Sequence, residues 1–69
     1  MKTSARNQFP GIVKELTKGP VSTEVTLEVA PGISVVAVIS TRSADALGLA
    51  VGTRAYALIK ASSVVVAVD

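Results

Sequence analysis

Two short clusters near opposite ends of the chain carry the residue types that bind a small anion. Ser4-Ala5-Arg6-Asn7 and Lys60-Ala61-Ser62 each offer a cation, a hydroxyl and backbone N–H groups, and neither contains a carboxylate. A doubly charged oxyanion presents acceptors only, so these are the donors that it needs. The chain has no His and no Cys, so it lacks the usual nucleophile–base pairs and the soft metal ligands. The sequence therefore predicts an anion-binding site with no catalytic residue, no metal and no cofactor.

The composition predicts an assembly of several copies. A chain of 69 residues without Cys has no disulfide to support it, and a domain of this size buries only roughly 60% of its unfolded surface. Nearly half of the residues (49%) are nevertheless apolar, which is more than a small monomer can easily hide. We expect one domain, residues 1–69, that forms a homo-oligomer.

Charge and hydropathy argue against nucleic-acid and membrane partners. The net charge of +2 is too small to indicate nucleic-acid binding. Polar sequence follows Met1 directly, without the apolar core of a signal peptide. Apolar runs such as residues 64–68 are five residues long, far below the ~20 residues that a membrane-spanning helix needs. We expect a cytoplasmic protein.

Alternating apolar and polar residues predict β-strands. In residues 22–29, Thr23, Val25, Leu27 and Val29 alternate with polar residues, which is typical of a half-buried strand. Residues 33–40 are apolar on both faces, as in a central or interface strand. Further strands are predicted over residues 7–18, with a bend at Pro10-Gly11, and over residues 53–60 and 64–68.

Turn residues separate these strands. Ala30-Pro31-Gly32 and Val51-Gly52 are typical of turns. Residues 43–48 predict one short helical turn, capped by Ser or Thr at its start and closed by Gly48. The predicted fold is all-β, a five-stranded OB-like barrel with one helical turn between its third and fourth strands.

With these elements placed, the chain resembles the molbindin (Mop) family of small molybdate- and tungstate-binding proteins. The resembling segments span almost the whole chain: Ser4–Asn7 with Gly11, Gly19–Val25, Ser40–Ser43, Leu47–Leu49, Gly52 and Lys60–Ser62. The resemblance implies a cytoplasmic hexamer, built as a trimer of dimers, that holds oxyanions between subunits. It also implies a role in molybdenum storage or homeostasis.

The resemblance implies two classes of oxyanion site. The site between paired subunits corresponds here to Ser4, Ala5, Arg6, Ser40, Ser43, Lys60, Ala61 and Ser62. The site on the three-fold axes corresponds to Gly19, Val21 and Ser22. Two departures from the family pattern bear on these sites. Ser40 stands where Thr is common, and Ser22 stands where Asn is common, beside a Pro20 that has no N–H to donate.

Simpler structural roles are open for several of these residues. Ser43 can cap the helical turn, Ser62-Ser63 can form a turn before the last strand, and Asn7 can fix a backbone turn. Two other functions also remain open. An OB-like barrel can bind nucleic acid, although Phe9 and Tyr56 are the only aromatic residues available for stacking. The domain can alternatively serve as a structural or ligand-sensing oligomerisation module.

Overall fold

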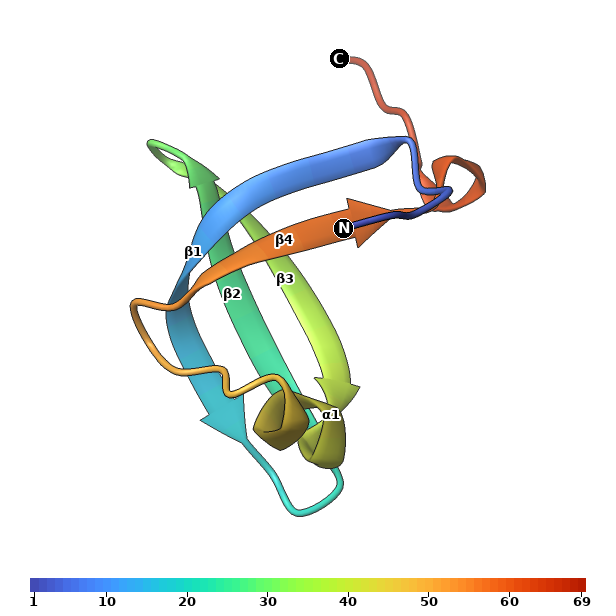
Figure 1. The fold of residues 1–69 in the computed structure, drawn as a ribbon. Helices are drawn as coiled ribbons and strands as arrows, with labels where there is room; N and C mark the ends of the chain where they lie inside the picture. The colour runs from blue at the N-terminus through green and yellow to red at the C-terminus, as the bar shows by residue number, and fades with distance from the viewer.

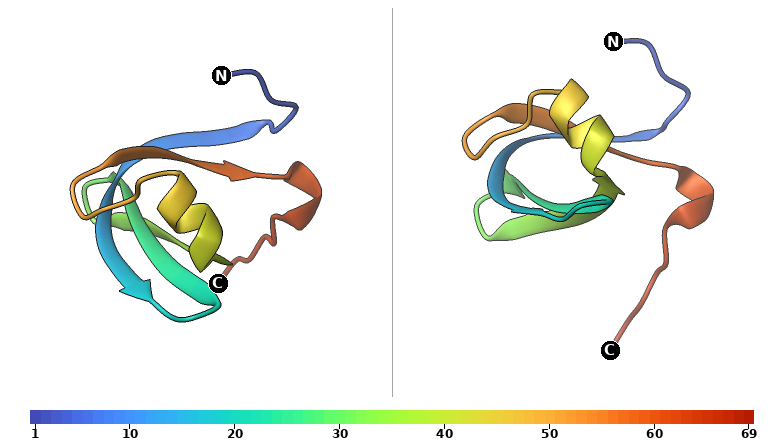
Figure 2. Two further views of the ribbon diagram at one scale, coloured as in Figure 1. Left: turned by 60° about the horizontal axis from the view of Figure 1, so that its bottom comes forward. Right: turned by 90° about the horizontal axis from the view of Figure 1, so that it is seen from below.

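The computed structural model describes all 69 residues, which form one antiparallel sheet with two short helical segments (Figure 1). The elements are β1 (Asn7–Lys18), β2 (Ser22–Ala30), β3 (Ile33–Ser40), α1 (Thr41–Ala46), β4 (Arg54–Ile59) and the 3-10 turn η1 (Ala61–Ser63). The strands lie in the order β3-β2-β1-β4. The sheet curls into a half-barrel, and α1 lies at its open end (Figure 2).

The long strand β1 makes the sheet curl because it changes partner along its length. Its first half pairs with β4 and its second half with β2, and Ile12 is paired on both sides. A methyl group at Gly11 would lie 2.7 Å from the carbonyl oxygen of Glu28, so only Gly lets β2 approach here. A bulge follows between Val13 and Glu15 and adds to the bending of the strand. The predicted bend at Pro10-Gly11 therefore lies where β1 changes from one partner to the other.

A small apolar core fills the concave side of the sheet. Its buried side chains are Val13, Val25, Leu27 and Ala57, and a fully buried Val or Leu contributes about 1.5–3 kcal/mol of stability. The alternation predicted for β2 is confirmed, because Thr23, Val25 and Leu27 are buried while Ser22 and Glu24 are exposed. Only six of 69 residues are buried, so a single chain has a minimal core.

The strand β3 is an edge strand, so a central position is wrong for it. One face, with Val35, Ala37 and Ile39, packs partly against the core. The other face leaves Val36 and Val38 largely exposed. The apolar pattern on both faces thus reflects a surface that a single chain leaves uncovered.

The short helix α1 begins two residues earlier than predicted, at Thr41. Ser40 is its N-cap, because its hydroxyl oxygen accepts a hydrogen bond from the N–H of Ser43 at 3.0 Å. Gly48 follows the helix with a φ of 64°, as predicted for the residue that closes it. The predicted turns at Pro31-Gly32 and Val51-Gly52 are also present.

The predicted fifth strand, residues 64–68, is wrong for the single chain. After η1 the backbone runs away from the sheet without a strand partner (Figures 1 and 2), and Val65 and Val68 are 91% and 92% exposed. A strand exists only where a neighbour pairs with its N–H and C=O groups, and this segment has none here. The observed fold is therefore a four-stranded half-barrel with one short helix.

The open side of the half-barrel is an apolar groove between its two edge strands. The groove has a volume of about 530 Å³, and all of its lining residues are apolar: Leu27, Val35, Val36, Ala37, Ile39 and Tyr56–Ile59. No helix of the chain has the length and apolar character needed to cross a membrane.

Candidate functional site

The two clusters singled out in the sequence line one pocket. Ser4, Ala5 and Arg6 precede β1, and Lys60, Ala61 and Ser62 follow β4. Together with Thr3 and Leu58 they surround a hollow of about 540 Å³. The predicted site residues from the two ends of the chain are therefore brought together.

The antiparallel pairing of β1 with β4 explains why these distant clusters meet. Asn7 lies opposite Ile59 in this pairing, so the residues before β1 and after β4 emerge at the same end of the sheet. The side-chain amide of Asn7 donates a hydrogen bond to the carbonyl oxygen of Ile59 at 3.1 Å. Asn7 thus holds the two strand ends together, and it does not form the backbone turn that the sequence left open for it.

Local hydrogen bonds shape each wall of the pocket. On one wall, the Gln8 side-chain amide donates to the carbonyl oxygen of Ala5 at 2.8 Å, and the N–H of Ala5 donates to the Thr3 hydroxyl at 3.1 Å. On the other wall, the N–H of Ser63 donates to the carbonyl oxygen of Lys60 at 2.8 Å and closes the η1 turn. The Ser62-Ser63 turn is therefore present, and it brings Ser62 to the pocket.

The pocket is electropositive. Arg6 and Lys60 supply its charge, and no Asp or Glu lines it. The ion pairs of the chain join Lys14 with Glu28 and Lys18 with Asp45, so neither pocket cation is neutralised by a carboxylate. Hydroxyls of Thr3, Ser4 and Ser62 add donors. An acceptor-only ligand is the chemistry that such a lining favours.

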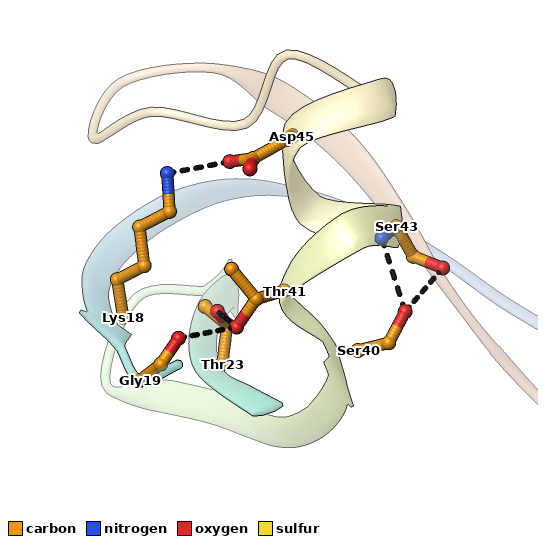
Figure 3. A network of polar contacts seen from close by, with 7 residues as sticks. All are labelled: Lys18, Gly19, Thr23, Ser40, Thr41, Ser43 and Asp45. Carbon is orange, nitrogen blue, oxygen red and sulfur yellow. Dashed lines mark hydrogen bonds and ion pairs between the residues drawn. The ribbon is translucent and has the colours of Figure 1, made fainter. Parts of the chain in front are cut away.

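Ser40 and Ser43 do not line this pocket. Both lie at the start of α1 (Figure 3), and α1 lies away from η1 (Figure 1). The Ser40 hydroxyl donates its proton to the Ser43 hydroxyl oxygen at 2.8 Å, which leaves the proton of Ser43 free to donate outward. Both residues are exposed. One chain therefore does not unite all eight residues of the first predicted site.

The turn between β1 and β2 holds the residues of the second predicted site. The N–H of Gly19 donates to the carbonyl oxygen of Ser22 at 3.0 Å, and a methyl group at Gly19 would lie 2.7 Å from that same oxygen. The side chains of Val21 and Ser22 are exposed. The N–H of Gly19 is thus used within the turn and is not available to a ligand.

Sequence reasoning missed Thr41, which fastens this turn to α1 (Figure 3). The hydroxyl of Thr41 donates to the carbonyl oxygen of Gly19 at 2.6 Å and lies 2.8 Å from the hydroxyl of Thr23. Its backbone N–H donates to the carbonyl oxygen of Val21 at 2.9 Å. The resembling segment Ser40–Ser43 includes Thr41, but only the observed register of β2 with β3 gives it this role.

The fold and the pocket define a small half-barrel module with an electropositive hollow where β1 begins and β4 ends. Residues 3–66 match the family model described as "TOBE domain". The chain belongs to the TOBE domain family and, within it, to the molbindin (Mop) proteins.

The relatives confirm the resemblance seen in the sequence. The chain is 48% identical over its full length to the molybdenum transport protein ModE of Herbaspirillum seropedicae, but it spans only 26% of that relative. MopII of Clostridium pasteurianum is 39% identical with a TM-score of 0.91, and the match covers 97% of this chain and all of MopII. A molybdate-binding protein from Sporomusa ovata is 36% identical with a TM-score of 0.89, over 97% of this chain and 98% of that one.

Proposed function

We propose that this chain is a binding protein for molybdate and tungstate, with no catalytic role, that serves molybdenum storage or homeostasis in the cytoplasm. The observation that carries the proposal is the pocket in which Arg6 and Lys60 converge without a carboxylate. Relatives that are named for molybdenum or molybdate and share the fold support it. Residues 1–69 act in this proposal as one Mop domain without a further cofactor.

The chemistry of the anion fits the pocket lining. Molybdate is tetrahedral and fully deprotonated near neutral pH, so every one of its oxygen atoms accepts hydrogen bonds. Each hydrogen bond to a charged group contributes about 1.5–3 kcal/mol, and several of them give roughly micromolar affinity or better. Phosphate keeps a proton near pH 7 that needs an acceptor, so a pocket of donors disfavours it. Sulfate has shorter bonds and is disfavoured by its size.

The site is completed by a second copy of the chain. Ser40 and Ser43 lie outside the pocket of their own chain, yet they present exposed hydroxyls, and Ser43 has a free proton. We place these hydroxyls of one copy against the Ser4–Arg6 and Lys60–Ser62 pocket of another. A second class of site is formed around a three-fold axis, in which Gly19 shapes the turn and Val21 and Ser22 supply the donors. Both belong to a hexamer built as a trimer of dimers.

The same assembly supplies the missing fifth strand. Each chain has two unpaired edge strands with an apolar groove between them, and it also has an exposed apolar segment, Val64–Val68, that no strand of its own pairs with. Residues 64–68 of one copy fit the groove of another, because burial of Val removes apolar surface from water and edge pairing satisfies its backbone. The five-stranded OB-like barrel is then a property of the oligomer.

Isothermal titration with molybdate, in a buffer that contains sulfate, tests the proposal. The unmodified chain should bind with micromolar affinity or better, and tungstate should bind comparably. Arg6→Ala and Lys60→Ala should each weaken binding to the pocket by about 10- to 150-fold, the equivalent of one charged hydrogen bond. Arg42→Ala is the matched control, because Arg42 is exposed and outside the pocket.

Two results would contradict the proposal. If the unmodified chain released no heat with either anion, the molybdate-binding role would be wrong. If Arg6→Ala and Lys60→Ala bound as tightly as Arg42→Ala, binding would occur at another place. Filter binding with single-stranded nucleic acid is the companion experiment, and we expect no retention because the chain offers only Phe9 and Tyr56 for stacking.

A further inference from the structure

We infer that Thr41 is a positioning residue that occupies two carbonyl oxygens of the Gly19–Ser22 turn and leaves the donors of Val21 and Ser22 for an anion. This inference rests on the proposed function, because it concerns the second class of oxyanion site. It adds a residue that makes no contact with the anion but decides which backbone groups the turn presents to it.

The argument begins with the acceptors of the turn. An anion is repelled by any carbonyl oxygen that faces it, so an anion site in a turn needs its carbonyl groups directed elsewhere. The carbonyl oxygens of Gly19 and Val21 both point to Thr41, which donates to them from its hydroxyl at 2.6 Å and from its N–H at 2.9 Å. One residue therefore occupies two of the acceptors of the turn.

Two hydrogen-bond donors of the turn have no partner within the chain. The N–H of Val21 donates to no acceptor within the chain, and Val21 is exposed. The hydroxyl of Ser22 likewise has no partner in the chain, and Ser22 is exposed. Pro20 has no N–H at all. Val21 and Ser22 thus hold the donors that the turn can still offer to an anion.

The hydroxyl of Thr41 has a fixed direction. It has one proton, which goes to the carbonyl oxygen of Gly19, so the Thr23 hydroxyl must be the donor in the 2.8 Å contact between the two threonines. Thr23 is fully buried, and its proton has Thr41 as its partner. The Thr41 proton therefore goes to the Gly19 carbonyl oxygen, and the Thr23 hydroxyl adds a donor to Thr41 without competing for that acceptor (Figure 3).

The test compares Thr41→Val, Thr41→Ser and Thr23→Val in an Arg6→Ala background, in which the remaining molybdate binding reports on the turn. Thr41→Val frees the carbonyl oxygen of Gly19 and should weaken the residual binding at least about tenfold, the equivalent of one charged hydrogen bond. Thr41→Ser keeps the hydroxyl and should restore it. Thr23→Val is the matched structural control, because it also removes a hydroxyl from the network but leaves the bond from Thr41 to Gly19 in place. Amide hydrogen exchange at Gly19 should accelerate more in Thr41→Val than in Thr23→Val.

Each outcome decides the inference. Equal molybdate binding by Thr41→Val and its background would overturn it, and so would an equal loss in Thr23→Val, which would indicate general destabilisation. If the unmodified chain binds molybdate but the Arg6→Ala background binds none, the inference fails and the proposed function stands. If the unmodified chain binds none, both fail. Selective loss in Thr41→Val with rescue by Thr41→Ser would establish Thr41 in this role.

Discussion

The side-chain amide of Asn7 and the carbonyl oxygen of Ile59 lie 3.1 Å apart and form a hydrogen bond where β1 begins and β4 ends. This bond joins the two halves of the electropositive pocket, because Arg6 directly precedes Asn7 and Lys60 directly follows Ile59. Asn7 itself does not line the pocket. Asn7 therefore affects anion binding indirectly, because its hydrogen bond sets the distance between Arg6 and Lys60.

Asn7→Ala should lower both stability and anion affinity without removing a charge. Loss of one hydrogen bond costs about 0.5–1.5 kcal/mol of unfolding free energy, and looser cations should weaken molybdate binding by up to about tenfold. Urea unfolding and isothermal titration measure the two effects. Thr17→Ala, at an exposed position of β1 outside the pocket, serves as control. Unchanged affinity in Asn7→Ala would mean that the pocket keeps its shape without this bond.

Gly11→Ala should destabilise the fold strongly. The added methyl group would lie 2.7 Å from the backbone oxygen of Glu28 and 3.2 Å from Cγ1 of Val29, so the β1 and β2 backbones must separate. We expect a loss of about 1–3 kcal/mol in urea unfolding, as for other overpacked sites. Gly52→Ala provides the comparison, because its methyl group would meet no atom and only its φ of 94° opposes the change. A Gly11→Ala protein as stable as wild type would show that the sheet yields easily here.

Asp45→Asn should strengthen anion binding at the β1–β2 turn. Asp45 forms an ion pair with Lys18 at 2.5 Å (Figure 3). Lys18 directly precedes the turn, so this pair neutralises a cation that an anion bound at the turn could use. Both side chains are about half exposed, so the change in unfolding free energy should stay below about 1 kcal/mol. Molybdate affinity in the Arg6→Ala background should rise by up to about fivefold at low salt and return to the parent value near 1 M salt. Glu28→Gln, which frees Lys14 away from the turn, is the control, and an equal gain there would indicate a general charge effect.

Val66→Asp should prevent assembly while leaving the single chain folded. Val66 is 85% exposed, so the substitution should cost the single chain little packing. In the proposed assembly, a charge in the apolar groove of a second copy is strongly unfavourable. Light scattering after size exclusion should report a smaller species than the oligomer proposed for the wild type, and circular dichroism should retain its β signal. Val51→Asp places the same charge on another exposed valine, in the loop before β4, and should assemble normally. A full-size oligomer of Val66→Asp would exclude the segment 64–68 from the interface.

Much of the half-barrel could be predicted because its signals are local. The alternation in β2, the Pro31-Gly32 turn and Gly48 after α1 depend on neighbours in the sequence. The meeting of Ser4–Arg6 with Lys60–Ser62 followed from the residue types and from the family resemblance. The fifth strand failed because an apolar run specifies β-structure only where a partner edge exists, and the same chain provides no such partner.

The role of Thr41 could not be predicted because it depends on an irregularity. Ala30 lies opposite Ile33, and a regular hairpin continued from this pair would set Ser22 opposite Thr41. A shift between Glu28 and Ala30 instead sets Ser22 opposite Ser40, so Thr41 lies one step beyond the pairing, where its N–H reaches Val21. A one-residue shift reverses which face each side chain occupies, and nothing in the sequence near Val29 marks it.

In the assembly proposed above, the separation of Ser40 and Ser43 from the pocket of their own chain has a consequence for how much anion the protein retains. When a ligand needs groups from two copies, ligand binding and subunit association are linked, and each one stabilises the other. Dilution of the protein then releases the anion even at a constant anion concentration. The fraction of anion that is bound should therefore rise more steeply than the protein concentration does. A cell could then set its store of bound anion through synthesis of the chain alone.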